Sequence, residues 1–163
     1  MQAFERDGIR LHYADERQGR ALTLVFVNSL GTDFRIWDAV VARLPGHMGA
    51  VRHDKRGHGL SDAPPAPYAL DDHVGDLAAL LDHLRTGPAV IVGVSVGGMI
   101  AQALALSRPD LVEALVLCDT GACIGTEQMW NDRIDAVSAN GLESIADAIL
   151  LRWFSEDFRT NRA

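Results

Sequence analysis

Residues 89–98 read Ala89-Val90-Ile91-Val92-Gly93-Val94-Ser95-Val96-Gly97-Gly98, an apolar run that changes abruptly to a glycine-rich turn. The apolar run is typical of a buried strand, and the apolar pattern of residues 98–107 has the period of a helix. A serine on a sharp turn from strand to helix, with small residues beside it, is lifted above the sheet. The helix behind it supplies unpaired N–H groups. We therefore predict Ser95 as a catalytic nucleophile.

Other glycine-rich turns bind phosphates or do no chemistry. A phosphate-binding P-loop needs Gly-Lys-Ser or Gly-Lys-Thr, and a dinucleotide site needs G-x-G-x-x-G. Neither pattern occurs around Ser95. A glycine-rich turn without chemistry remains the alternative to the nucleophile.

Apolar runs and helical patterns alternate on both sides of this turn. The predicted strands of a central sheet are residues 22–27, 48–51, 89–92 and 115–117, and their apolar character indicates coverage on both faces. The predicted helices between them are residues 34–44, 70–85 and 98–107. Residues 3–7 and 9–15, joined at Asp7-Gly8, predict a hairpin. This order predicts an α/β fold with a doubly wound, mostly parallel sheet.

The pattern changes from about Gly121, where two predicted helices, 126–139 and 142–153, follow with no strand between them. We predict a core over residues 1–122 and the start of a helical lid over residues 123–163. In this lid Trp130 and Trp153 could line an apolar pocket, and Arg133 or Arg152 could meet a substrate carboxylate. Packing aromatics and solvated arginines are the alternative.

The loop Val27-Asn28-Ser29-Leu30-Gly31-Thr32-Asp33 follows the first central strand, where this kind of fold places an oxyanion-hole donor. We predict the backbone N–H groups of Leu30 and Val96 as the two donors. An ordinary loop with Gly31 at a turn is the alternative.

A second polar, glycine-rich loop reads Asp54-Lys55-Arg56-Gly57-His58-Gly59-Leu60-Ser61. His58 and Ser61 could be taken for catalytic partners. In the α/β hydrolases, which the turn at Ser95 resembles, the chain order is serine, acid, histidine, whereas His58 precedes Ser95. We predict a structural role instead, in which Asp54 and Arg56 brace the loop.

The general base that a serine nucleophile needs is missing, because no histidine follows Ser95. Asp119 lies at the end of the next strand, where some α/β hydrolases carry the catalytic acid. The commoner position of this acid in that superfamily lies one strand later. We therefore expect a chain cut inside its lid, without the catalytic histidine and acid. Such a chain should be weakly active or inactive, and its uncovered apolar surface should favour self-association.

Composition excludes several other classes. The net charge of −7, from 15 basic and 22 acidic residues, gives no footprint for nucleic acid. No apolar stretch is long enough to span a membrane, and charges occupy the N-terminus, so we expect a cytoplasmic protein. Cys118 and Cys123 offer too few ligands for a zinc site, and we expect reduced thiols and no metal.

The loops at 28–33 and 54–61 and the turn at 93–98 together resemble the α/β-hydrolase superfamily, and within it, with Trp37, the 3-oxoadipate enol-lactonases. The lactonase resemblance depends mainly on Asn28-Ser29-Leu30-Gly31 and on residues 118–130. It implies hydrolysis, without a cofactor, of a small anionic enol-lactone or ester in the β-ketoadipate pathway of aromatic catabolism. A carboxylesterase, a cofactor-free haloperoxidase-like enzyme and a non-catalytic fragment remain alternatives. Haloalkane dehalogenases are disfavoured, because they carry aspartate where Ser95 stands.

Overall fold

The computed structural model describes residues 2–161 and begins with a hairpin. Strands β1 (Gln2–Arg6) and β2 (Ile9–Asp15) pair antiparallel, with Arg6 opposite Ile9. Asp7 and Gly8 connect them with φ angles of 51° and 79°. Positive φ at both central residues is the conformation of a type I′ hairpin turn, which confirms the predicted hairpin.

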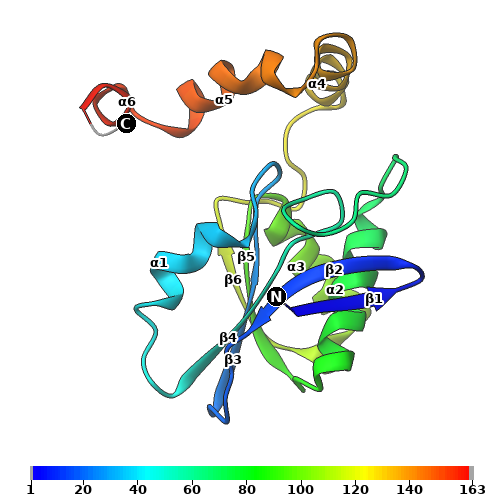
Figure 1. The fold of residues 1–163 in the computed structure, drawn as a ribbon, viewed down its shortest axis with the longest axis vertical. Helices are drawn as coiled ribbons and strands as arrows, with labels where there is room; N and C mark the ends of the chain where they lie inside the picture. The colour runs from blue at the N-terminus through cyan, green and yellow to red at the C-terminus, as the bar shows by residue number, and fades with distance from the viewer. Residues whose placement is uncertain (1, 162–163) are drawn as a thin grey trace. The chain divides into compact units, whose positions relative to one another are not determined.

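A six-stranded sheet forms the centre of the fold, in the order β1-β2-β4-β3-β5-β6 (Figure 1). Its remaining strands are β3 (Leu22–Val27), β4 (Met48–His53), β5 (Ala89–Val94) and β6 (Val112–Cys118). Strands β4, β3, β5 and β6 run parallel, and β2 pairs antiparallel with β4. The mostly parallel sheet is therefore confirmed, although β4, β5 and β6 extend beyond the predicted limits.

Helices cover both faces of this sheet (Figure 1). On one face Val25, Val51 and Ile91 are buried against α2 (Leu70–Leu84) and α3 (Val96–Ser107). On the other face Phe26, Ala50 and Val92 pack with Trp37. Successive residues of a strand point to opposite faces, so an unbroken apolar run fills both layers of core. The doubly wound arrangement is confirmed.

The predicted helix 34–44 is wrong as a single helix. The structure has a 3₁₀ turn, η1 (Phe34–Trp37), followed by one α-helical turn, α1 (Asp38–Val41). The Asp33 carboxylate caps η1 by accepting from the Arg35 N–H at 2.9 Å. Pro45 then disfavours helical backbone at the residue before it, so the pattern cannot continue.

Strand β6 also differs from its prediction. It lies at one edge of the sheet that residues 2–161 form, and Val116 and Leu117 are each 45% exposed. Coverage of residues 115–117 on both faces is therefore wrong for the described chain. A short 3₁₀ turn, η2 (Pro109–Leu111), leads into this strand.

The chain divides into two compact units, Met1–Ile124 and Gly125–Ala163. The second unit is helical. Its elements are α4 (Glu127–Asn140), η3 (Leu142–Ile145), α5 (Ala146–Trp153) and α6 (Glu156–Asn161).

The helix predicted at 126–139 is confirmed as α4, and the Thr126 hydroxyl caps it by accepting from the Met129 N–H at 3.2 Å. The helix predicted at 142–153 is divided between η3 and α5, and α6 was not predicted. Arg162 and Ala163, the last residues of the predicted lid, lie outside the described residues. No helix within residues 2–161 has the length and apolar content needed to span a bilayer.

Candidate active site

Ser95 occupies the turn between β5 and α3 with a φ of 55° and a ψ of −124°. This backbone conformation is normally adopted by glycine, and it is strained for a residue with a side chain. Three donors hold the Ser95 carbonyl: the N–H groups of Gly98 at 2.9 Å and Met99 at 3.3 Å, and the Thr120 hydroxyl at 2.6 Å. The Ser95 N–H donates to the Cys118 carbonyl at 3.1 Å. The surrounding chain thus fixes the strained turn from several sides.

The glycines of this turn are required by close backbone contacts. A Cβ on Gly97 would lie 2.2 Å from the Val27 carbonyl oxygen, and one on Gly93 would lie 2.4 Å from the Gly97 carbonyl oxygen. A Cβ on Gly98 would lie 2.5 Å from the Thr120 side chain. The turn therefore packs directly against the end of β3, as the motif predicted.

The loop after β3 emerges beside this turn, because Val27 lies opposite Gly93 in the parallel register. Polar side chains stabilise this loop by hydrogen bonds within it. The Asn28 amide donates to the Thr32 carbonyl, and the Thr32 hydroxyl donates to the Ser29 carbonyl at 3.0 Å. Neither Leu30 nor Val96 donates its N–H to any acceptor within residues 2–161. Both predicted oxyanion donors are thus available on neighbouring segments.

The loop after β4 braces this region, as predicted. The buried Asp54 carboxylate accepts from the N–H groups of Phe34 at 2.8 Å and Leu60 at 3.0 Å, and it contacts His12 Nδ1 at 2.8 Å. Arg56 pairs with Asp76 of α2. The Asp54 and Arg56 contacts confirm the structural role predicted for this loop.

Lys55 also holds the loop after β3, a contact that the sequence did not reveal. It is only 2% exposed, and its ammonium donates to the carbonyls of Asn28 at 2.9 Å and Ser29 at 3.0 Å. Burial lowers its pKa to about 7. A lysine in a polar, glycine-rich loop normally indicates a solvated side chain, so only the tertiary contact discloses its position. Thr120 was missed for the same reason.

The six histidines all precede Ser95, and none is hydrogen-bonded to it in the part of the chain that the structure describes. His58 Nδ1 lies 3.0 Å from the Arg56 carbonyl oxygen, and burial lowers its pKa. Asp119 has a φ of 46° and an exposed side chain, between Cys118 and Thr120. Within residues 2–161 the geometry thus places Ser95 on a strained turn near two backbone N–H groups without acceptors, with no histidine hydrogen-bonded to the serine.

The model of the alpha/beta hydrolase fold family matches residues 22–145. The chain belongs to this family. The α/β hydrolase is 37% identical over 150 residues to 3-oxoadipate enol-lactonase 2 of Acinetobacter baylyi, covering 92% of this chain and 56% of that protein. It also matches the crystal structure of the enol-lactonase from Burkholderia xenovorans, with 39% identity and a TM-score of 0.91.

That structural match covers 96% of this chain and 61% of the Burkholderia chain. A thermophilic esterase from Thermogutta terrifontis is 28% identical with a TM-score of 0.88, over 99% of this chain and 62% of that one. This α/β hydrolase therefore spans little more than half the length of the curated enol-lactonase it matches.

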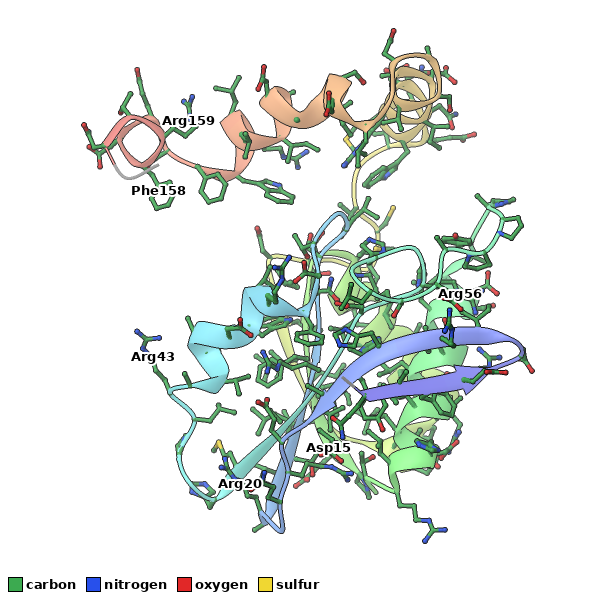
Figure 2. All side chains as sticks on the ribbon, in the orientation of Figure 1. Asp15, Arg20, Arg43, Arg56, Phe158 and Arg159 are labelled. Carbon is green, nitrogen blue, oxygen red and sulfur yellow. The ribbon has the colours of Figure 1, made fainter. Side chains whose placement is uncertain are left out.

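Within the second unit of the α/β hydrolase, the Arg133 guanidinium lies over the Trp130 ring, 5.6 Å from its centre. Trp153, at the end of α5, is 47% exposed, and Arg152 is exposed. A hollow of about 520 Å³ in this unit is bordered by other residues, including Leu150, Phe154, Phe158 and Arg159. Phe158 and Arg159 belong to α6 (Figure 2).

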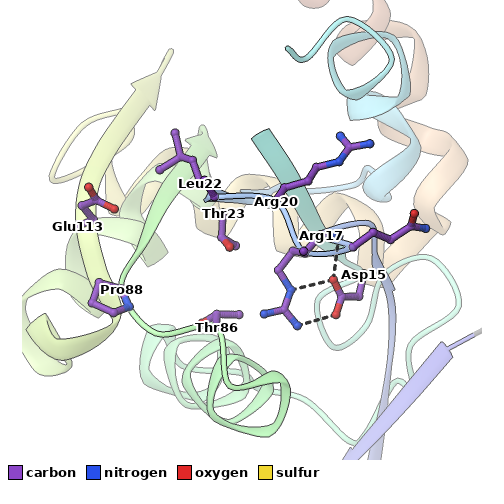
Figure 3. Close-up of a pocket in the computed structure, with 11 residues that line it drawn as sticks. Asp15, Arg17, Arg20, Leu22, Thr23, Thr86, Pro88 and Glu113 are labelled. Carbon is purple, nitrogen blue, oxygen red and sulfur yellow. Dashed lines mark hydrogen bonds and ion pairs between the residues drawn. The ribbon is translucent and has the colours of Figure 1, made fainter. Parts of the chain in front are cut away.

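A second hollow, of about 370 Å³, is lined by Leu22 and Thr23 at the beginning of β3 and by Pro88 just before β5 (Figure 3). Asp15, Arg17, Thr86 and Glu113 are among its lining residues, and Arg17 pairs with Asp15 at 2.6 Å. Thr86 precedes β5, whereas Ser95 follows it. This hollow is separate from the candidate site.

Proposed function

We propose that these 163 residues carry the nucleophile and the oxyanion donors of a serine hydrolase that cleaves carboxylic esters or lactones. The observation that carries this proposal is the backbone of Ser95, with its φ of 55° on a turn from strand to helix. Such a conformation costs on the order of 1–3 kcal/mol for a residue with a side chain. Glycine would avoid this cost, so the presence of a hydroxyl here supports a chemical role.

In the proposed reaction, Ser95 Oγ attacks the substrate carbonyl carbon while its proton passes to a general base. The resulting oxyanion accepts hydrogen bonds from the N–H groups of Leu30 and Val96. The C–O bond of the ester or lactone then breaks, the leaving oxygen takes up a proton, and an acyl-enzyme remains. Water hydrolyses this intermediate, which releases the acid and restores Ser95.

We propose that the base and its acid partner come from polypeptide outside these 163 residues. No histidine follows Ser95, and the curated enol-lactonase that the chain matches is longer. Asp119 is hydrogen-bonded to no histidine among residues 2–161, so the present contacts give it no role as the acid.

As substrate we propose 3-oxoadipate enol-lactone or a similar small anionic lactone, used in aromatic catabolism in the cytoplasm. The two enol-lactonase matches, at 37% and 39% identity, support this choice. A substrate carboxylate would suit a bidentate contact with Arg133, and the rings of Trp130 and Trp153 would suit its apolar part.

The test is labelling of the purified chain with a fluorophosphonate probe, with and without added imidazole as a substitute base. We expect slow labelling alone and faster labelling with imidazole, both abolished in Ser95→Ala. Ser107→Ala is the matched control, because Ser107 lies on α3 and its hydroxyl donates to the Ala103 carbonyl, away from the turn. Labelling that persists in Ser95→Ala, or none at any imidazole concentration in a folded chain, would contradict the proposal.

A general carboxylesterase is the second candidate, favoured by the match to the Thermogutta esterase. Hydrolysis of an enol-lactone and of acyclic esters, measured side by side with imidazole, separates the two. Faster Ser95-dependent turnover of the lactone supports the lactonase, and the reverse order supports the esterase.

A further inference from the structure

Lys55 is buried in a way that stability alone does not explain. Its ammonium forms no ion pair with any carboxylate among residues 2–161, and its two acceptors are the backbone carbonyls of Asn28 and Ser29. Removing a charge from water is costly unless strong partners replace the solvent, and buried lysines are accordingly rare. Both acceptors of this buried ammonium lie in the loop that carries the predicted oxyanion donor Leu30.

The geometry of the peptide group links Lys55 to that donor. The Ser29 carbonyl and the Leu30 N–H belong to one planar peptide unit, and among the described peptide bonds only Ala66–Pro67 is cis. In a trans unit the C=O and N–H point in opposite directions. Fixing the Ser29 oxygen against Lys55 therefore also fixes the direction of the Leu30 N–H.

The same contact changes the strength of the donor. A carbonyl that accepts from an ammonium is polarised, and polarisation across the peptide unit makes its N–H a better donor. The Ser29 oxygen accepts from Lys55 at 3.0 Å and from the Thr32 hydroxyl at 3.0 Å. The Leu30 N–H itself has no acceptor within the described chain and is free to bind a substrate oxygen.

We propose that Lys55 is a positioning residue for the proposed reaction, which orients the Ser29–Leu30 peptide and strengthens the Leu30 N–H as an oxyanion donor. This inference rests on the proposed function for the role of Leu30. It assigns to Lys55 no contact with substrate.

The other end of the loop is held by the residue next to Lys55. The Asp54 carboxylate accepts from the Phe34 N–H at 2.8 Å, where η1 begins. Two consecutive residues after β4 thus fix the beginning and the end of the segment 28–34. Contacts from the loop after β4 therefore hold the chain on both sides of Leu30.

The charge of Lys55 can change near neutral pH. Burial lowers its pKa to about 7, and the neighbouring Asp54 opposes that shift. The other titratable groups that interact with it are His53, His58 and His73. As pH rises through the pKa of Lys55, the ammonium loses its charge and the polarisation of the Ser29–Leu30 peptide should weaken.

The direct test is the amide resonance of Leu30 in nuclear magnetic resonance spectra of the whole chain. We expect the Leu30 amide proton to move upfield as pH rises, following the titration of the Lys55 side chain. Val96 is the internal control, because its peptide unit includes Ser95 and receives no contact from Lys55. A Leu30 resonance that stays constant while Lys55 titrates would overturn the proposal.

Two variants extend the test. Lys55→Met keeps the length of the side chain without its charge, and Lys55→Arg keeps the charge. We expect an upfield Leu30 amide in Lys55→Met that no longer changes with the former Lys55 titration, and partial recovery in Lys55→Arg. If Lys55→Met does not fold, the titration of the unmodified protein still decides the question.

Reactivity separates this inference from the proposed function. Removal of a whole oxyanion donor costs about 10²–10³ in rate, so a weakened donor should slow imidazole-assisted fluorophosphonate labelling of Lys55→Met by about tenfold. Unchanged labelling in a folded Lys55→Met would contradict the inference. Absence of all labelling, with the Leu30 amide still following Lys55, would refute the proposed function and leave the orienting role of Lys55 in place.

Discussion

Arg56 and Asp76 form a buried two-point ion pair, in which Nε and Nη2 of Arg56 each lie 2.7 Å from a carboxylate oxygen of Asp76. Arg6 of β1 donates to the same carboxylate at 3.0 Å. One side chain of α2 therefore ties the hairpin and the loop after β4 to the core. That loop also contains Asp54 and Lys55, so the pair anchors the same loop whose side chains hold the segment 28–34.

Asp76→Asn should destabilise the protein strongly, because it removes the carboxylate charge that pairs with buried Arg56 at two points and leaves only the 3.4 Å contact with Asp72. We expect a loss of about 3 kcal/mol in the free energy of unfolding, measured by urea denaturation. The matched control is Asp82→Asn on the same helix, which removes an exposed pair with Arg108. A similar loss in both variants would show that burial does not determine the effect.

Gly97→Ala should disrupt the turn at Ser95, because the added Cβ would meet the Val27 carbonyl oxygen at 2.2 Å and neither backbone can yield easily. We expect a loss of at least about 2 kcal/mol in unfolding free energy. Gly46→Ala is the control, since a Cβ added to Gly46 would have no atom within 4 Å and the φ of this residue lies outside the left-handed region. A stable Gly97→Ala variant would refute the close packing of the turn against β3.

Stability should fall as the solution is acidified from pH 6.5 to about pH 4, in part because of His53. Burial lowers the pKa of this histidine from 6.5 to about 4, so between these values the unfolded chain binds more protons than the folded one. We expect His53→Gln to reduce the pH-dependent loss by about 3 kcal/mol, measured by denaturation at several pH values. The pKa of His73 is also lowered to about 4, so the His53→Gln variant should still lose part of its unfolding free energy as the pH falls. Exposed His47→Gln serves as the control, and an unchanged slope in His53→Gln would contradict the assignment.

The edge of β6 should promote association between copies of this chain. Val116 and Leu117 are adjacent, so they expose apolar surface on opposite faces of the sheet beside unpaired backbone groups. We expect sedimentation velocity to show concentration-dependent oligomers that Leu117→Lys reduces. Leu60→Lys changes a 63% exposed leucine in a loop and should leave association unaffected. A purely monomeric chain at high concentration would count against this expectation.

Local patterns were sufficient to predict the hairpin, the parallel strands and the turn at Ser95, because each depends on neighbouring residues. Asp7-Gly8 fits a type I′ turn, and consecutive β-branched residues fit a sheet covered on both faces. The prediction of one helix over residues 34–44 was wrong because apolar spacing does not distinguish a continuous helix from a 3₁₀ turn followed by a single α-helical turn. For β6, the apolar pattern could not say whether another strand lies beside it.

The contacts that shape the candidate site were less predictable. Lys55 and Thr120 act on backbone carbonyls from distant segments, and their residue types give no signal of burial. Arg133 and Trp130 are brought together because they lie three residues apart on one helix, a contact that helical spacing allows. The roles proposed for them, and for Ser95, Leu30 and Val96, stay predictions.

The backbone of Ser95 also bears on how this sequence can evolve. Serine holds a conformation that glycine would adopt without strain, so Ser95→Gly is a single change that selection for folding alone would favour. Under the proposed function, selection for the hydroxyl opposes this change. In a lineage that no longer uses the proposed reaction, position 95 should therefore be among the first of the turn to change.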